Sequence, residues 1–99
     1  MKKTSDERIL VARAMACGPG LRLLRKKSMA SLRAVAEQVF VHYSHLSRVE
    51  RGLAGASVAT LDNLAIYYGF GHSVKRLLVR AELLQTRSKK SSTRGEGRA

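Results

Sequence analysis

One short segment of the chain carries hydrogen-bond donors and cations at helical spacing. The outward side of a helix predicted over residues 43–51 holds Ser44, Ser47, Arg48 and Arg51. At about 100° per residue, Leu46 and Val49 fall on the inward side, and Glu50, the only carboxylate, lies nearer to them. Short donors and long cations without an acid suit the base edges and phosphates of DNA, whereas the simpler interpretation is a solvated polar face.

The sequence lacks the residue groupings of catalysis and metal binding. His42 and His45 stand three residues apart, but no acidic or cysteine ligand accompanies them at metal spacing. The single cysteine, Cys17, excludes an internal disulfide and a cysteine-rich zinc site. There is no glycine-rich phosphate loop and no pair of carboxylates suited to acid–base work. We therefore expect a protein that is not an enzyme and that uses no cofactor and no metal.

The charge of the chain indicates an anionic partner. Nineteen Lys and Arg stand against seven Asp and Glu, which gives a net charge of +12. A hydrophobic content of 44% is enough for one compact core, and no apolar run approaches the ~18 residues of a membrane span. Residues 86–99 hold five basic residues, one acidic residue and no large apolar side chain. This segment is predicted to be a disordered basic tail that can lie along phosphates.

The rest of the chain reads as short helices separated by brief breaks. Residues 1–19 form an N-terminal extension, with a helix that Thr4 and Glu7 would start as a capping box and that Gly18-Pro19-Gly20 ends. Further helices are predicted over residues 21–27, 31–39 and 43–51, from Ser57 or Thr60 to Gly69, and over 73–85. In the helix over 21–27, the inward side chains are Leu21, Leu24 and, beyond its end, Met29. We expect an all-α fold, a compact bundle of five to six short helices, with its main domain over residues 20–85.

Two of these helices, 31–39 and 43–51, are joined by three residues, which is the spacing of a helix-turn-helix. Their sequence resembles the phage repressor/Cro-like family, also called the XRE family, at Ser31, Val35-Ala36-Glu37, Val41, Leu46-Ser47, Val49-Glu50 and Gly52. The resemblance covers about residues 20–71 and implies a lambda-repressor-like DNA-binding domain. Phe40 departs from the pattern, because the family usually has a turn glycine there, and core contacts would have to offset the backbone cost. Leu32 stands where many members carry a glutamine that touches phosphate.

The resemblance also implies roles for individual residues. The recognition helix is 43–51, and the side chains expected to read base edges are Tyr43, Ser44, Ser47, Arg48 and His42. Those expected to contact phosphates are Ser31, Arg33, Arg51, Lys26 and Lys27. Arg48 has the best chemistry for guanine, because one guanidinium can bond O6 and N7 together. Arg25 and Glu50 match a structural ion pair that fixes the recognition helix against the first helix of the family's domain.

An apolar stripe on helix 73–85 allows two interpretations. Its members are Val74, Leu77, Leu78, Ala81 and Leu84. They form either a homodimer seam, which would set two recognition helices about one DNA turn or roughly 34 Å apart, or a surface packed on the chain's own core. A second candidate interface is the helix over 7–17, with Ile9, Leu10, Val11 and Met15.

These features together predict a sequence-specific transcription regulator that binds double-stranded DNA. In the simplest case it is a repressor that occupies a palindromic operator as a homodimer, in the cytoplasm and on the nucleoid of a bacterium, or encoded by a phage. An antitoxin-type or adaptor module that binds a protein partner as well as DNA is the alternative. A third interpretation is non-specific binding of DNA or RNA through charge alone. No membrane partner is expected.

Overall fold

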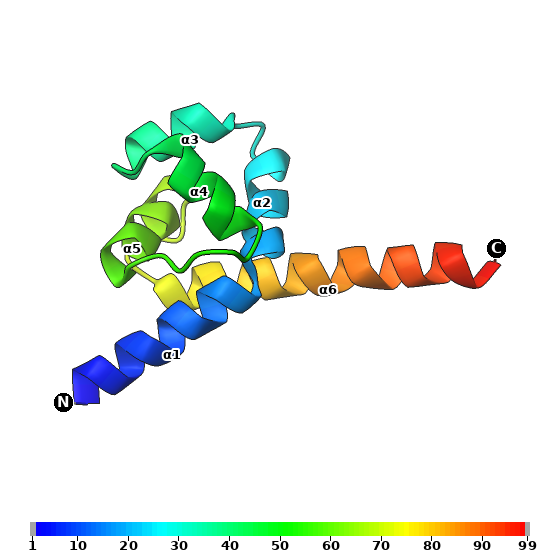
Figure 1. Cartoon of the computed structure of the whole chain (residues 1–99), viewed down its shortest axis with the longest axis horizontal. Coiled ribbons are helices and arrows are strands. Elements are labelled where there is room, and N and C mark those ends of the chain that lie inside the picture. The colour runs from blue at the N-terminus through cyan, green and yellow to red at the C-terminus, as the bar shows by residue number, and fades with distance from the viewer. Residues whose placement is uncertain (1, 99) are drawn as a thin grey trace.

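The computed structural model describes the backbone of residues 2–98 and the side chains of residues 6–87. Within this range the chain forms six helices and no strand. In chain order they are α1 (Lys2–Ala16), α2 (Gly18–Lys27), α3 (Leu32–Gln38), α4 (Tyr43–Glu50), α5 (Val58–Tyr67) and α6 (Val74–Arg98). Helices α2 to α5 make a compact globule, and α1 and α6 run along one side of it toward opposite ends of the molecule (Figure 1). The all-α helical bundle predicted from the sequence is confirmed.

Serine side chains start three of the helices, as the sequence predicts. The Oγ atoms of Ser31, Ser57 and Ser73 accept hydrogen bonds of 3.1–3.2 Å from backbone N–H groups three residues on, at the first turns of α3, α5 and α6. Gly52 and Gly69 follow α4 and α5 with φ of +75° and +91°, a conformation that glycine adopts without a Cβ clash.

The N-terminal helix starts earlier than the capping box predicts. Helix α1 begins at Lys2, so Thr4 lies inside the helix rather than before it. The side chain of Thr4 lies outside the described residues. The Thr4–Glu7 spacing therefore predicts this helix correctly but places its first residue too late in the sequence.

The Gly18-Pro19-Gly20 triplet does more than separate two helices. All three residues belong to the first turn of α2, where both glycines are buried against other elements. A Cβ on Gly20 would overlap the backbone carbonyl oxygen of Ala81 in α6, and a Cβ on Gly18 would overlap that of Val49 in α4. The missing side chains therefore let α2 approach α4 and α6 at backbone contact.

The predicted homodimer seam on α6 is corrected by the burial of its side chains. Leu77, Leu78 and Ala81 are fully buried and Val74 nearly so, in the same core as residues of α2 to α5, with Leu84 packed against its edge. A side chain already covered by its own chain cannot also form a seam with a second copy. The apolar stripe of α6 is the surface that holds this helix on α2 and α5.

Two large apolar side chains that were expected to reach the core lie outside it. Met29 is 90% exposed and Phe40 is 83% exposed. Both residues have a positive φ, +61° and +62°, in the turns that follow α2 and α3. The left-handed turn directs each side chain away from the bundle, so the core contacts expected for Phe40 do not form. Leu32, in contrast, packs against the core.

The C-terminal part of the chain also differs from the sequence prediction. The backbone of α6 continues to Arg98, where a disordered tail is predicted over residues 86–99. Residues 86–94 contain no proline or glycine to interrupt the helix that the packed turns of α6 begin. Side chains beyond Arg87 lie outside the described residues, so contact of this segment with phosphates stays a prediction. None of the described helices is long and apolar enough to cross a membrane.

Candidate nucleic-acid interface

The turn between α3 and α4 is held by the backbone of α3. Val41 donates its N–H to the carbonyl oxygen of Ala36 at 3.0 Å, and Phe40 supplies the left-handed residue between them. Val39 is buried and Val41 half-buried beside the turn, so the chain is anchored where it changes direction. This connection fixes the angle at which α4 leaves α3, which is the defining feature of a helix-turn-helix.

The sequence-predicted base reader His42 lies at the N-cap of α4. Its Nδ1 accepts the backbone N–H of Ser44 at 3.1 Å and lies 2.8 Å from the Ser44 Oγ. The His42 ring therefore satisfies an N–H group that the first turn of a helix leaves without an intrahelical partner. His42 is exposed, and its side-chain hydrogen bonds among the described residues use Nδ1 and not Nε2, so capping leaves one ring nitrogen for an external contact.

Tyr43, the first residue of α4, lies between two other side chains. The His42 ring stacks on it with centroids 4.5 Å apart, and the guanidinium of Arg33 in α3 lies 4.5 Å from its ring centroid. The tyrosine is still 40% exposed. A cation held over an aromatic face gains about 0.5–1 kcal/mol at an exposed site, so this contact orients Arg33 and Tyr43 toward the same side of the molecule.

The remaining candidates on α4 share the exposed side of the helix. Ser44, Arg48 and Arg51 are exposed and Ser47 is half-buried, while Leu46 and Val49 are in the core. The Nε of Arg51 donates a long hydrogen bond of 3.4 Å to the Ser47 carbonyl oxygen, which keeps its guanidinium along the helix. The structure thus brings together the polar face that the helical spacing predicts, and no carboxylate of the described residues of α4 lies on it.

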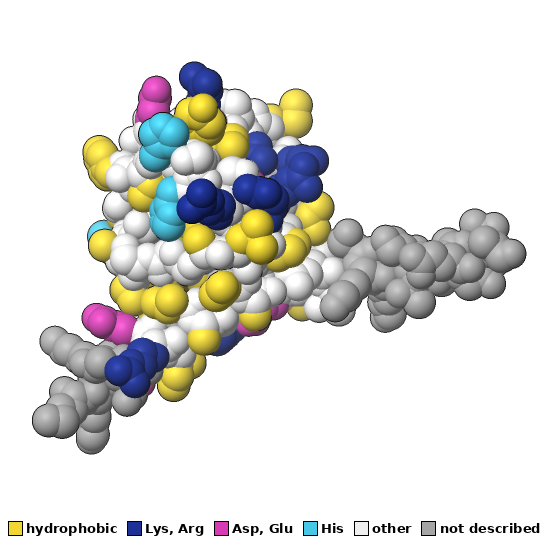
Figure 2. Space-filling model, viewed as in Figure 1, with side chains coloured by type: hydrophobic (Ala, Val, Ile, Leu, Met, Phe, Trp, Pro, Cys, Tyr) yellow, Lys and Arg dark blue, Asp and Glu magenta, His cyan; other side chains and the backbone are white. Residues whose placement is uncertain are grey.

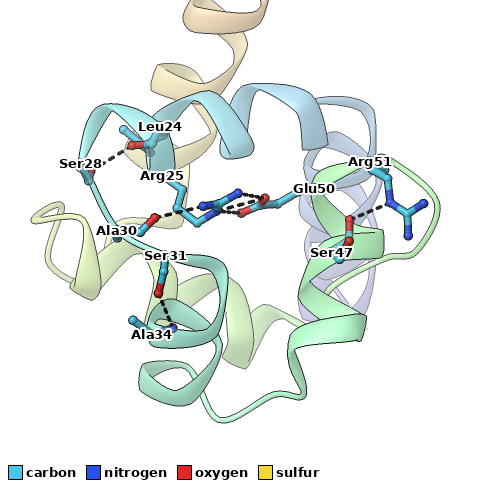
Figure 3. A network of polar contacts seen from close by, with 9 residues as sticks. All are labelled: Leu24, Arg25, Ser28, Ala30, Ser31, Ala34, Ser47, Glu50 and Arg51. Atoms are coloured by element: carbon cyan, nitrogen blue, oxygen red, sulfur yellow. Dashed lines mark hydrogen bonds and ion pairs between the residues drawn. The ribbon is translucent and has the colours of Figure 1, made fainter.

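An ion pair fixes the C-terminal end of α4 to α2. Arg25 donates from Nε to Glu50 Oε2 at 2.8 Å and from Nη2 to Oε1 at 3.1 Å, and its Nη1 donates to the Ala30 carbonyl oxygen at 3.0 Å (Figure 3). The Arg25 and Glu50 side chains are only 12% and 5% exposed. Hydrogen bonding to Glu50 raises the pKa of Arg25, against the opposing effect of burial. One arginine therefore joins α4 to α2 and to the link between α2 and α3.

Tyr68, which follows α5, lies close to this ion pair. Burial raises the pKa of its hydroxyl, and the negative charge of Glu50 raises it further, while the positive charge of Arg25 opposes the shift. The phenol therefore stays neutral at any physiological pH. Tyr68 therefore adds no charge beside the nearly buried pair of Arg25 and Glu50.

The sequence-predicted phosphate contacts surround α4 rather than lie on one helix. Ser31 is at the start of α3, where its Oγ is engaged by the Ala34 N–H, and Arg33 follows it. Lys26 and Lys27 are exposed at the end of α2. Figure 2 shows dark-blue Lys and Arg side chains and cyan histidines gathered over the part of the globule that α2, α3 and α4 form. Lys and Arg side chains and serine hydroxyls are among the donors that contact nucleic-acid phosphates.

Sequence reasoning missed three features of this site. They are the capping role of His42, the stacking of Arg33 on Tyr43, and the contacts of Gly18 and Gly20 with α4 and α6. The first had a readable signal, because His42 stands immediately before the first residue of a predicted helix, where a side-chain acceptor is needed. The other two depend on distances between helices, which spacing along one helix does not give.

The comparisons with known proteins agree with this geometry. A family model described as a helix-turn-helix domain matches residues 18–78. The match runs from the first residue of α2 into the first turns of α6 and so includes the α3–α4 pair and the ion pair beneath it. Searches of the curated proteins and of the solved structures give no match.

Proposed function

The chain belongs to the helix-turn-helix domain family, and on that premise we propose that it is a sequence-specific transcription regulator of the phage repressor/Cro-like type. In this proposal α4 enters the major groove of double-stranded DNA, which is about 12 Å wide and admits one helix. The observation that carries the proposal is the polar face of α4, which is free of acids and is held in place by the buried pair of Arg25 and Glu50.

Each side chain of this face has a chemical role in the proposal. Arg48 bonds guanine O6 and N7, and Ser44 and Ser47 donate to or accept from base edges near it. Tyr43 contacts a thymine methyl group or a phosphate, and His42 supplies its Nε2 edge at the start of the helix. Phosphates on the two sides are met by Ser31, Arg33, Arg51, Lys26 and Lys27.

We further propose that the protein acts as a homodimer that represses by occupying a palindromic operator. With the stripe of α6 buried, the outward side of α1 is the remaining candidate interface, since Ile9 is 57% and Met15 is 41% exposed on it. Ile9→Glu is expected to convert a dimer into a monomer in sedimentation equilibrium. The matched control is Ile66→Glu on α5, which changes an isoleucine that is 46% exposed.

Selection of bound sequences from a random duplex pool, with the full chain, tests the function. The expected result is a two-fold symmetric motif, and Arg48→Ala then weakens binding to the selected duplex about tenfold or more and relaxes one base position in each half-site. Arg80→Ala, an exposed arginine on α6, is the control that keeps the motif. Loss of affinity for all duplexes alike, with no selected motif, would instead establish non-specific binding through charge.

A further inference from the structure

A small apolar groove lies on the outer side of α6, opposite the stripe that this helix buries. Val79 and Leu83 stand one turn apart on α6 and are 47% and 50% exposed. Phe70, from the link between α5 and α6, is half-buried at the head of the groove, and three cations complete its walls: Lys75, Arg76 and Arg80. A hydrophobic groove is a surface into which another protein can lay the apolar face of an amphipathic helix.

The charges around this groove have no partner within the part of the chain that the structure describes. None of the ion pairs formed there involves Lys75, Arg76 or Arg80. The nearest acid on the same helix, Glu82, is turned toward α1 and engaged by Arg13 at 2.8 Å. Among the described residues, the cations on the rim of this apolar centre therefore have no ion-pair partner.

This groove is separate from the polar face of α4. Helix α6 packs mainly on α2 and α5, at the side of the globule away from α3 (Figure 1). The groove is formed from the side of α6 that points away from this packing, because Leu77 and Leu78 occupy the inner side. Both surfaces can therefore be occupied at the same time.

We propose that the groove docks an acidic amphipathic helix of a partner protein. Leucine or phenylalanine side chains of that helix would cover Val79, Leu83 and Phe70, and its Asp and Glu residues would meet the surrounding cations. This inference goes beyond DNA binding and does not depend on it. It gives the protein a second binding surface, through which a partner could be brought to the DNA that α4 holds.

The charge of the groove decides against two other occupants. A second copy of the chain, in a two-fold contact, would bring together two faces that each carry Lys75, Arg76 and Arg80 and no acidic residue in their lining, so the two faces repel each other. DNA would be attracted by the cations, but its phosphates gain nothing from three apolar side chains at the centre of the site. Only a partner surface that is both apolar and acidic complements the apolar centre of the groove and the cations on its rim together.

A peptide selection with the full-length protein tests the proposal. A displayed library of random 16-residue peptides is selected on the wild type and then sorted for loss of binding to Leu83→Ser. The expected survivors carry Asp or Glu beside large apolar residues at i, i+3 or i+4. Their affinity is expected to fall at least about fivefold with Leu83→Ser and with Arg80→Glu, and between 50 and 300 mM NaCl.

The control is Ile66→Ser, which removes an equally exposed aliphatic side chain from α5 and is expected to leave peptide affinity unchanged. Survivors that are basic or neutral, or no survivor that depends on Leu83, would overturn the proposal. The same holds if Leu83→Ser changes the oligomeric state in sedimentation equilibrium, because a second copy would then be the occupant. If Arg80→Glu and Leu83→Ser weaken duplex DNA binding as much as Arg48→Ala does, the groove is a DNA surface.

Discussion

Two ion pairs of this protein have nearly the same geometry and different surroundings, and their loss is expected to have different costs. Arg25 and Glu50 form a two-pronged pair between α2 and α4, and Arg13 and Glu82 form one between α1 and α6, with shortest N–O distances of 2.8 Å in both. The first pair is 12% and 5% exposed, whereas the second is 34% and 42% exposed. The replacement of each glutamate by glutamine therefore separates the effect of burial from the effect of geometry.

Burial sets the magnitude of each effect. Glu50→Gln leaves the guanidinium of Arg25 in the interior without its counter-charge, a change that costs about 3 kcal/mol when one partner of a buried pair is removed. Glu82→Gln leaves Arg13 beside water, which screens its charge, so the cost is below about 1 kcal/mol. The first loss is a large part of the about 5–15 kcal/mol by which a domain is stable, so Glu50→Gln is expected to stay mostly folded but to unfold at a clearly lower urea concentration than the wild type.

Urea denaturation followed by circular dichroism measures both losses on the full chain. If Glu50→Gln is within about 1 kcal/mol of the wild type, or if the two variants are equally destabilised, burial does not set the cost of losing the pair. DNA affinity at 10 °C, where Glu50→Gln is mostly folded, gives a second readout. There the variant is expected to bind the selected duplex more weakly than Glu82→Gln does, since Glu50 lies on α4, the proposed recognition helix, whereas Glu82 lies on α6.

Three further predictions concern packing and titration. Gly20→Ala, whose Cβ would overlap the Ala81 carbonyl oxygen, is expected to destabilise the fold by about 2–3 kcal/mol in urea denaturation. In the control variant Gly55→Ala, the new Cβ meets only the movable Val11 methyl group at 3.2 Å, so the expected cost is less than about 1 kcal/mol. Burial raises the pKa of the Cys17 thiol to about 11, so iodoacetamide at pH 8 should modify it only as fast as the chain opens, and an immediate reaction in the native protein would contradict this. The hydrogen bond from Arg13 lowers the pKa of Glu82, so the stability that this pair contributes is present above about pH 5 and disappears as the pH falls below about 4. The difference in Tm between the wild type and Glu82→Gln should therefore vanish below about pH 4.

The elements of this fold could be predicted from the sequence because their signals are local. A serine oxygen that caps a first turn, a glycine that leaves a last turn, and apolar residues at i, i+3 and i+4 each act within one helix. Ser31, Ser57 and Gly52 therefore mark the ends of helices in the structure as they do in the sequence. The polar side of α4 follows from the same periodicity, since burial of Leu46 and Val49 leaves the opposite residues exposed.

What the sequence could not give is the identity of the surface that each apolar residue meets. The stripe of α6 has the same spacing whether it faces α2 of its own chain or a second copy, and only the close approach at Gly20 decides for the first. Phe40 failed as a core residue for a related reason, since a φ of +62° turns its side chain outward whatever its hydrophobicity. The hydrophobic pattern predicts which residues can be buried, whereas the backbone conformation and the neighbouring helices determine the surface against which each residue packs.

Helix α2 contacts both helices that carry the proposed binding surfaces, α4 and α6. Within its first turn Gly18 contacts the end of α4 and Gly20 contacts α6, and two turns later Arg25 holds Glu50 of α4. A rotation of α2 would therefore move α4 and α6 together, because the helices touch at backbone atoms and cannot slide past one another without a clash. The proposed DNA face and the proposed groove on α6 are thus held at one fixed angle by a single ten-residue helix. A partner docked on α6 would meet bound DNA in one orientation, which is the geometry that an adaptor at an operator requires.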